Sequence, residues 1–286
     1  MQRALEHRKA RRWSDALADY QAAKQLAPDD PEVHRGVKLF ERLGKFLAEI
    51  RELDARIAAV PDDVQTLGDR ALLFLRSDDA ELALLDSEQA AATAPWAVRP
   101  KLFQALALIA LGRGGECEAL GVDRRIHLNA LTPEFLDTIS RVDGEISVEQ
   151  TNPDLYIARA WQLNEIGQPR LALADVETAL QHDANSAGAH AERSYALTKL
   201  GRGDEALEEI KRATELDANF AAAWQYRGEL ELARGDLAAA IESLSRALTI
   251  SPNVAALQKR EHAYRQIGDT QKADDDLHAL EALSAR

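Results

Sequence analysis

The chain has 286 residues, of which 46% are hydrophobic, so it is long and apolar enough for two globular domains or one elongated array and is not a disordered chain. A formal net charge of −13 argues against nucleic acid as a partner, because affinity for nucleic acid comes mainly from neutralising phosphates. The single cysteine, Cys117, excludes an intrachain disulfide framework, and no apolar stretch approaches the ~20 residues that span a bilayer.

Helical segments in the first 131 residues follow one another as an imperfect repeat. Abundant Ala and Leu favour helices, and the prolines Pro28, Pro61 and Pro95 end segments, because proline cannot continue a helix. Small and large apolar residues mark the segments: Trp13, Ala16, Tyr20, Ala23, Ala83 and Ala90. The first repeat lacks the start of its first helix, so we expect a segment of a longer protein, or an array with one end covered by a partner.

Two of these N-terminal repeats are degenerate. The second is expected from Pro31 to Asp63, with its turn at Leu43-Gly44-Lys45. The fourth begins with a helix from about Arg99 to Leu111, which ends at Gly112.

An additional helix is expected after this N-terminal array. Ala83 and Ala172 hold equivalent places but lie 89 residues apart, which is two periods of 34 and 21 residues more, enough for one helix and a turn. Phe135, Ile139, Val142 and Ile146 then recur at helical spacing. We predict a helix from Pro133 to Ser147, with Thr132 as its N-cap. The alternative is a degenerate repeat over residues 119–152.

Four regular repeats follow. The small residue of the second helix recurs at intervals of 34, 34 and 33 residues, as Ala172, Ala206, Ala240 and Ala273. The turn glycines keep the same register, as Gly167, Gly201, Gly235 and Gly268. Asparagines close three of the repeats, as Asn185, Asn219 and Asn253. Small residues at these places let two helices approach closely, while large apolar residues fill the space beside them.

The segment from Ala221 to Asn253 resembles the tetratricopeptide repeat closely. The resemblance is carried by Trp224, Gly228, Gly235-Asp236, Ala240, Leu244, Ala247 and Pro252. It implies an all-α solenoid, a right-handed superhelix of about eight helix pairs plus one extra helix, whose concave face is lined by first helices. We divide the chain into an N-terminal array (1–131), an extra helix and linker (132–152) and a C-terminal array (153–286).

An arginine recurs in the first helix of six repeats, and an acidic residue follows 16 positions later in five of them. The arginines are Arg3, Arg70, Arg159, Arg193, Arg227 and Arg260. The residues that follow are Asp19, Asp86, Asp175, Glu209, Ser243 and Asp276. This pattern predicts an Arg–carboxylate bond between the two helices of a repeat. The alternative, a ladder of arginines for anionic ligands, is weaker because each arginine brings its own counter-charge.

No catalytic or metal-binding pattern stands out. The sequence has no Gly-rich phosphate loop and no closely spaced Cys/His set, and its seven histidines are scattered over unrelated repeat positions. The basic run Arg8-Lys9-Arg11-Arg12 is interpreted as a solvated helix end. We therefore expect no enzyme activity, no cofactor and no metal.

The resemblance implies a scaffold or adaptor that binds a peptide segment or partner protein in the concave groove. The residues expected there are Ile157, Trp161, Asn164, Glu165, Tyr195, Thr198, Lys199, Gln225, Glu229, Leu232, His262 and Arg265. The positions that bind a chaperone's C-terminal carboxylate in related repeats hold no suitable cation or amide. They are Ile157, Trp161, Glu192, Ala222 and Tyr226.

Other roles stay open at this point. The chain could be the regulatory module of a larger enzyme whose catalytic domain is absent, or a structural subunit that self-assembles through the open ends of the array. Residue usage rich in Ala and Arg, with one Met, is typical of a bacterial protein from a GC-rich genome. The compartment would be the bacterial cytoplasm or, where an upstream signal has been removed, the periplasm.

Overall fold

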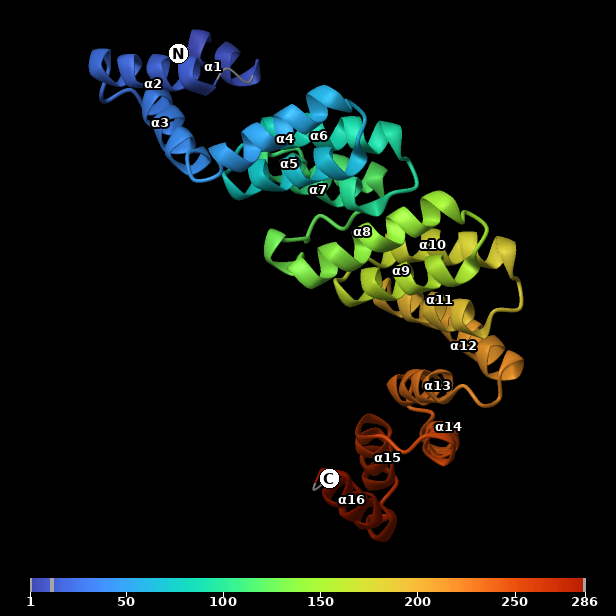
Figure 1. Ribbon diagram of the computed structural model, residues 1–286. Coiled ribbons are helices and arrows are strands. Elements are labelled where there is room, and N and C mark those ends of the chain that lie inside the picture. Colours follow the sequence, from blue (N-terminus) through green and yellow to red (C-terminus); the bar gives the residue numbers. More distant parts are fainter. Residues whose placement is uncertain (1, 11–12, 285–286) are drawn as a thin grey trace. The chain divides into compact units, whose positions relative to one another are not determined.

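The computed structural model describes residues 2–10 and 13–284, and all regular structure in these ranges is helical (Figure 1). The α-helices are α1 (Gln2–Lys9), α2 (Trp13–Leu26), α3 (Pro31–Leu43), α4 (Leu47–Ala59), α5 (Val64–Arg76), α6 (Ala80–Thr93), α7 (Val98–Ala110), α8 (Pro133–Val148), α9 (Pro153–Glu165), α10 (Pro169–His182), α11 (Ala187–Lys199), α12 (Gly203–Leu216), α13 (Ala221–Ala233), α14 (Leu237–Ile250), α15 (Val254–Gln266) and α16 (Thr270–Ser284). Two 3₁₀-helices, η1 (Gly114–Leu120) and η2 (Leu128–Ala130), lie between α7 and α8. No helix in the described ranges is long and apolar enough to cross a membrane.

The chain forms two compact units, residues 1–143 and 144–286. In the first unit α1 packs on α2 and α5 on α6, and in the second unit the pairs are α9/α10, α11/α12, α13/α14 and α15/α16. The second helix of a pair also packs on the first helix of the next. This arrangement confirms the predicted all-α repeat solenoid. The boundary between the units falls inside α8, within the predicted linker region 132–152, and the three-part division stays a prediction.

Local signals in the sequence set the helix ends. In five helices, the side-chain oxygen of the residue just before the helix accepts a hydrogen bond from a backbone N–H of the first turn. These N-cap residues are Asp30 for α3, Asp63 for α5, Asn152 for α9, Ser186 for α11 and Asn253 for α15. The turns inside the regular repeats need a left-handed residue, and the predicted glycines supply it, as at Gly201 with φ 75°. The spacing of these glycines thus fixes where each helix pair turns.

The second repeat departs from the prediction. The chain turns at residues 44–46, close to the expected turn at Leu43-Gly44-Lys45, but Gly44 has φ −54° and ψ −30°, a right-handed helical conformation, and lacks the left-handed one of the regular turns. The Gly44 amide donates to the Phe40 carbonyl at 2.9 Å, which continues the helical pattern, and the chain runs on into α4. As a result α3 packs on α2 and α4 on α5, whereas α3 and α4 do not pack side by side. We call α3 and α4 an opened pair, because each packs on a neighbouring repeat and they do not pack on each other.

The fourth repeat consists of α7 without an α-helical partner. Only η1 and η2 lie between residues 111 and 132, so α7 is followed by two 3₁₀-helices where a regular repeat has its second α-helix. The extra helix predicted from Pro133 to Ser147 is α8, and its residues Phe135, Ile139, Val142 and Ile146 are buried. The alternative of a repeat over residues 119–152 is wrong, because that range, all of it described, holds a single α-helix.

Helix α8 also caps α7. Asp143 in α8 accepts the backbone N–H groups of Val98 and Arg99, at 3.1 Å and 3.2 Å, and so takes the place of a local cap at Ala97, whose side chain makes no such bond. A helix N-terminus favours a negative charge, so the extra helix stabilises the end of the fourth repeat.

The predicted Arg–carboxylate bonds are present in five repeats. They join Arg3 to Asp19, Arg70 to Asp86, Arg159 to Asp175, Arg193 to Glu209 and Arg260 to Asp276. In the remaining repeat, where Ser243 replaces the acid, Glu231 accepts from both Arg227 at 2.9 Å and Ser243 at 2.6 Å. The bond between the helices is thus kept through a third residue.

Close helix packing at Gly228 leads to a stability prediction. A Cβ at this position in α13 would lie 2.6 Å from Leu244 Cγ in α14, so Gly228→Ala is expected to lower the free energy of unfolding by roughly 1–3 kcal/mol. A Cβ at Gly144 in α8 would meet no heavy atom within 4 Å, and Gly144→Ala is expected to add about 0.5–1 kcal/mol. Urea denaturation of the two variants measures whether the free energy of unfolding falls for Gly228→Ala and rises for Gly144→Ala. Equal stability of the two would show that α13 and α14 can separate at no cost.

Candidate interaction site

The first helices α9, α11 and α13 lie side by side in the second unit, and α13 contacts α15. Most of the predicted binding residues on these helices are accessible. The exposed ones are Trp161, Glu165, Thr198, Lys199, His262 and Arg265, and the partly exposed ones are Ile157, Tyr195, Gln225, Glu229 and Leu232. Trp161 is 48% exposed, which is unusual for a residue of its size.

Asn164 occupies a different place from the one predicted. It is 2% exposed, so its side chain adds almost nothing to the accessible surface. Its Nδ2 donates to Glu192 Oε2 at 2.9 Å, across from α9 to α11. Asn164 therefore acts as a positioning residue for the Glu192 carboxylate.

Two tyrosines from adjacent helices meet on the same side. The rings of Tyr195 in α11 and Tyr226 in α13 lie 5.6 Å apart between centroids, with an angle of 46° between planes. Lys199 Nζ lies 4.9 Å from the centroid of the Tyr195 ring, within the range of a cation–π contact. The predicted residues Tyr195 and Lys199 are thus brought together with a tyrosine that was not among them.

Negative charge surrounds this aromatic pair. Burial raises the pKa of Glu192, the hydrogen bond from Asn164 opposes that shift, and the charge of Glu165 adds to it. The pKa of Tyr226 is raised to about 12, first by burial and next by the negative charge of Glu192. The charges of Glu229 and Glu165 act on Tyr226 in the same direction.

Trp161 belongs to the same surface. It precedes Asn164 by three residues and Glu165 by four, so the three side chains share one side of α9, the side that bonds to Glu192. We call the surface formed by Trp161, Glu165, Glu192, Tyr195, Tyr226 and Glu229 the acidic–aromatic face. Two of these residues, Glu192 and Tyr226, are not among the predicted binding residues. In the sequence they stand out only because they occupy positions where related repeats bind a chaperone's C-terminal carboxylate.

The predicted binding residues on α15 contact other side chains of α15 and α16. Arg265 bonds to Glu261 and lies 3.6 Å from Asp274, and His262 is 2.8 Å from the side chain of Gln266. No contact in the described ranges joins Arg265 or His262 to the tyrosine pair. The acidic–aromatic face therefore rests on α9, α11 and α13.

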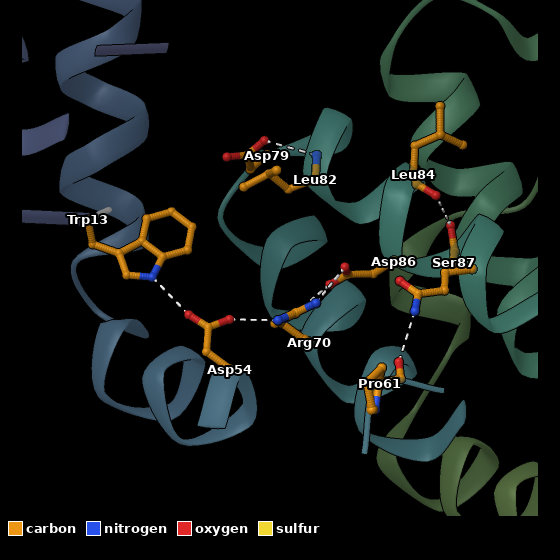
Figure 2. A network of polar contacts seen from close by, with 10 residues as sticks. Trp13, Asp54, Pro61, Arg70, Asp79, Leu82, Leu84, Asp86 and Ser87 are labelled. Carbon is orange, nitrogen blue, oxygen red and sulfur yellow. Dashed lines mark hydrogen bonds and ion pairs between the residues drawn. The ribbon is translucent and has the colours of Figure 1, made fainter. Parts of the chain in front are cut away.

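The recurring arginines lie between helices. Arg70 and Arg159 are each 2% exposed and make two bonds to the carboxylate of their own repeat. Figure 2 shows Arg70 between Asp86 and Asp54, and Asp54 in turn accepts from Trp13 Nε1 at 3.0 Å. These buried, neutralised arginines do not suit a ladder for anionic ligands.

The basic run near the N-terminus is not a wholly solvated helix end. Arg8 is 5% exposed and bonds to Glu81 at 2.7 Å, with Asp79 at 3.4 Å. The three line a cavity of about 420 Å³ in the first unit, and burial is the main cause that raises the pKa of Asp79. Arg11 and Arg12 lie outside the described residues. The interpretation as a solvated end is wrong for Arg8, because α1 lies against the start of α6.

Cys117 packs in the first unit. It is 1% exposed, its Sγ lies 3.6 Å from the Ala105 carbonyl oxygen, and burial raises its pKa. A thiol in this setting is held as the protonated, unreactive form, so Cys117 acts as a packing residue.

Similarity to a known family covers the helices of the acidic–aromatic face. The model of a family described as tetratricopeptide repeat matches residues 157–219 and 196–255. No curated protein sequence matches the chain significantly.

Solved structures similar to the chain include three repeat proteins. MamA is 21% identical over 51% of this chain and 88% of its own, with a TM-score of 0.45. PilW, a type IV pilus biogenesis factor, is 15% identical over 77% of this chain and 92% of its own, with a TM-score of 0.44. YrrB, "a TPR protein with an unusual peptide-binding site", is 21% identical over 73% of this chain and 97% of its own, with a TM-score of 0.37. The family match covers residues 157–255, and the helix pairs of that region have the sequence pattern of tetratricopeptide repeats.

Proposed function

We propose that the chain is a scaffold or adaptor that binds a segment of a partner protein on the acidic–aromatic face. The observations that support it best are the half-exposed Trp161 on α9 and the Tyr195–Tyr226 pair on α11 and α13, first helices that pack together. Trp and Tyr dominate binding energy at protein interfaces, because they bury a large apolar area and keep a polar tip. A repeat solenoid offers such side chains on an extended surface.

Catalysis is not part of this proposal. The acidic–aromatic face has carboxylates and phenols but no nucleophile paired with a base, and the raised pKa of Tyr226 keeps its hydroxyl protonated near neutral pH. A larger enzyme that uses this chain as an interaction module would still bind its partner through the same face.

Site-specific crosslinking tests the proposal. A photo-crosslinking amino acid at Thr198, exposed on α11, should crosslink a partner in the cell that produces the protein. The same amino acid at Glu208, which is 78% exposed on the second helix α12, is the matched control and should give no such product. Mass spectrometry of the Thr198 product identifies the partner and the crosslinked segment.

Two results would contradict the proposal. Crosslinking at Glu208 that equals crosslinking at Thr198 would place the binding surface on second helices. A product made only of two copies of this chain would favour the self-assembling subunit, and sedimentation over a concentration series would then show growth of the assembly.

A further inference from the structure

Three carboxylates from three consecutive first helices lie on the acidic–aromatic face without a cation. Glu165, Glu192 and Glu229 come from α9, α11 and α13, and all three act on the titration of Tyr226. Within residues 13–284 none of the three makes an ion pair with Lys, Arg or His. The interhelical carboxylates of the second unit do the opposite, since each binds an arginine: Asp175, Glu209, Glu231 and Asp276.

The Glu192 carboxylate is held in place although its burial is unfavourable. Asn164 fixes it at 2.9 Å, and Gln225 holds Glu229 in the same manner through Nε2 at 3.1 Å. Both bonds come from neutral amides, which orient a carboxylate and leave its charge in place. Like charges gathered on a partly buried surface are destabilising unless an opposite charge joins them.

Asn164 gives an independent sign of a missing donor. The residue is only 2% exposed, and its Oδ1 accepts no hydrogen bond. Buried acceptors without a donor are rare in folded proteins and are commonly satisfied by a ligand or water. This acceptor lies next to the Glu192 carboxylate, where an incoming N–H group would meet both.

The aromatic pair already binds one cation. Lys199 Nζ, on the next turn of α11, lies over the Tyr195 ring at 4.9 Å. The face of a tyrosine ring attracts ammonium and guanidinium groups, and the attraction grows as water is excluded. The Tyr226 ring lies beside Tyr195 and close to Glu192, so carboxylate and ring can act on the same positive charge.

We propose that the acidic–aromatic face takes a lysine or arginine side chain of an extended partner segment, held by Glu192 and Glu229 beside Tyr195 and Tyr226. This inference rests on the proposed function and names the chemistry of the partner. The cation neutralises the carboxylates, donates to the oxygens of Glu192 and Asn164, and packs its aliphatic stem on the tyrosines and Trp161. The net charge of −13 speeds the approach of a basic segment.

A positional-scanning library of acetylated, amidated decapeptides tests the proposal, because such peptides carry no terminal charges. Sub-libraries with Lys or Arg fixed should bind the full chain more tightly than those with Gln, Asp or Glu fixed. Glu192→Gln should reduce this preference about 10-fold, since the amide keeps the Asn164 contact and removes the charge. Glu208→Gln removes the same charge from the exposed surface of α12, and this variant should keep the preference.

The outcomes separate the two proposals. A basic preference that Glu192→Gln and Glu208→Gln reduce equally would show attraction to the overall negative charge only, and would overturn the inference. Binding that favours neutral or acidic sub-libraries and is lost in Trp161→Ala would also overturn it, while the proposed function would stand. If no sub-library binds, and Thr198 crosslinks no partner in the cell, both proposals fail.

Discussion

Replacing Arg70 with methionine is expected to lower the free energy of unfolding of the first unit by about 3–5 kcal/mol. Arg70 is 2% exposed, donates to Asp86 at 2.7 Å and 2.8 Å, and donates to Asp54 at 2.6 Å. The variant would remove both bonds to Asp86, which is itself 1% exposed, and water has little access to replace them. Hydrogen exchange of α5 and α6, measured by mass spectrometry in a urea series, gives the loss.

Two variants control for the loss of an arginine as such. Arg3 makes the equivalent bond to Asp19, but its side chain is 76% exposed, so Arg3→Met should leave the free energy of unfolding close to that of the wild type. The double variant Arg70→Met/Asp86→Leu should recover much of the loss, because two apolar side chains in contact need no solvation. If Arg70→Met were as stable as Arg3→Met, the network in Figure 2 would contribute nothing to the fold.

Trp161→Ala is expected to weaken binding of the partner crosslinked at Thr198 by at least about 2 kcal/mol, or roughly 30-fold in Kd. The side chain is 48% exposed, so its removal leaves no large cavity, and the helical circular dichroism and Tm should stay close to those of the wild type. Isothermal titration calorimetry with the crosslinked segment as a synthetic peptide gives the affinity.

Trp96→Ala is the matched control for Trp161→Ala. Trp96 is 37% exposed and belongs to the first unit, so its removal should leave the Kd unchanged. A Trp161→Ala protein that melts far below the wild type and binds the peptide normally would show that Trp161 belongs to the core. The interaction surface would then lie toward Glu229 and Arg265.

The repeat pattern could be predicted because its signals are local. A turn glycine, a small residue and an arginine followed 16 residues later by an acid all lie within one repeat, so each pair can be recognised without knowing its neighbours. Gly201, Ala206 and the Arg159–Asp175 bond are where the spacing predicted them. The solitary helix α8 could be predicted for a similar reason, since Thr132 and Pro133 mark its start.

Features that depend on distant residues could not be predicted. Gly44 has the right residue type for a left-handed turn, yet it is right-handed, and α3 packs on α2 while α4 packs on α5. The cap of α7 comes from Asp143, 45 residues away from Val98. The role of Glu192 depends on burial by two neighbouring helices, which changes the cost of its charge without leaving a trace in the spacing.

The 16-residue separation of the Arg–carboxylate bonds bears on how the chain folds. Each bond closes a loop inside one helix pair, as between Arg70 and Asp86 or Arg260 and Asp276, so little chain entropy is lost before the contact forms. Proteins dominated by such short-range contacts fold fast, and a nascent chain can complete one pair before the next leaves the ribosome. The opened pair of α3 and α4 lacks this local closure and must wait for α5. We therefore expect the slowest step of co-translational folding at residues 31–76. The helix pairs before this segment can form earlier, and those after it can form without waiting for it.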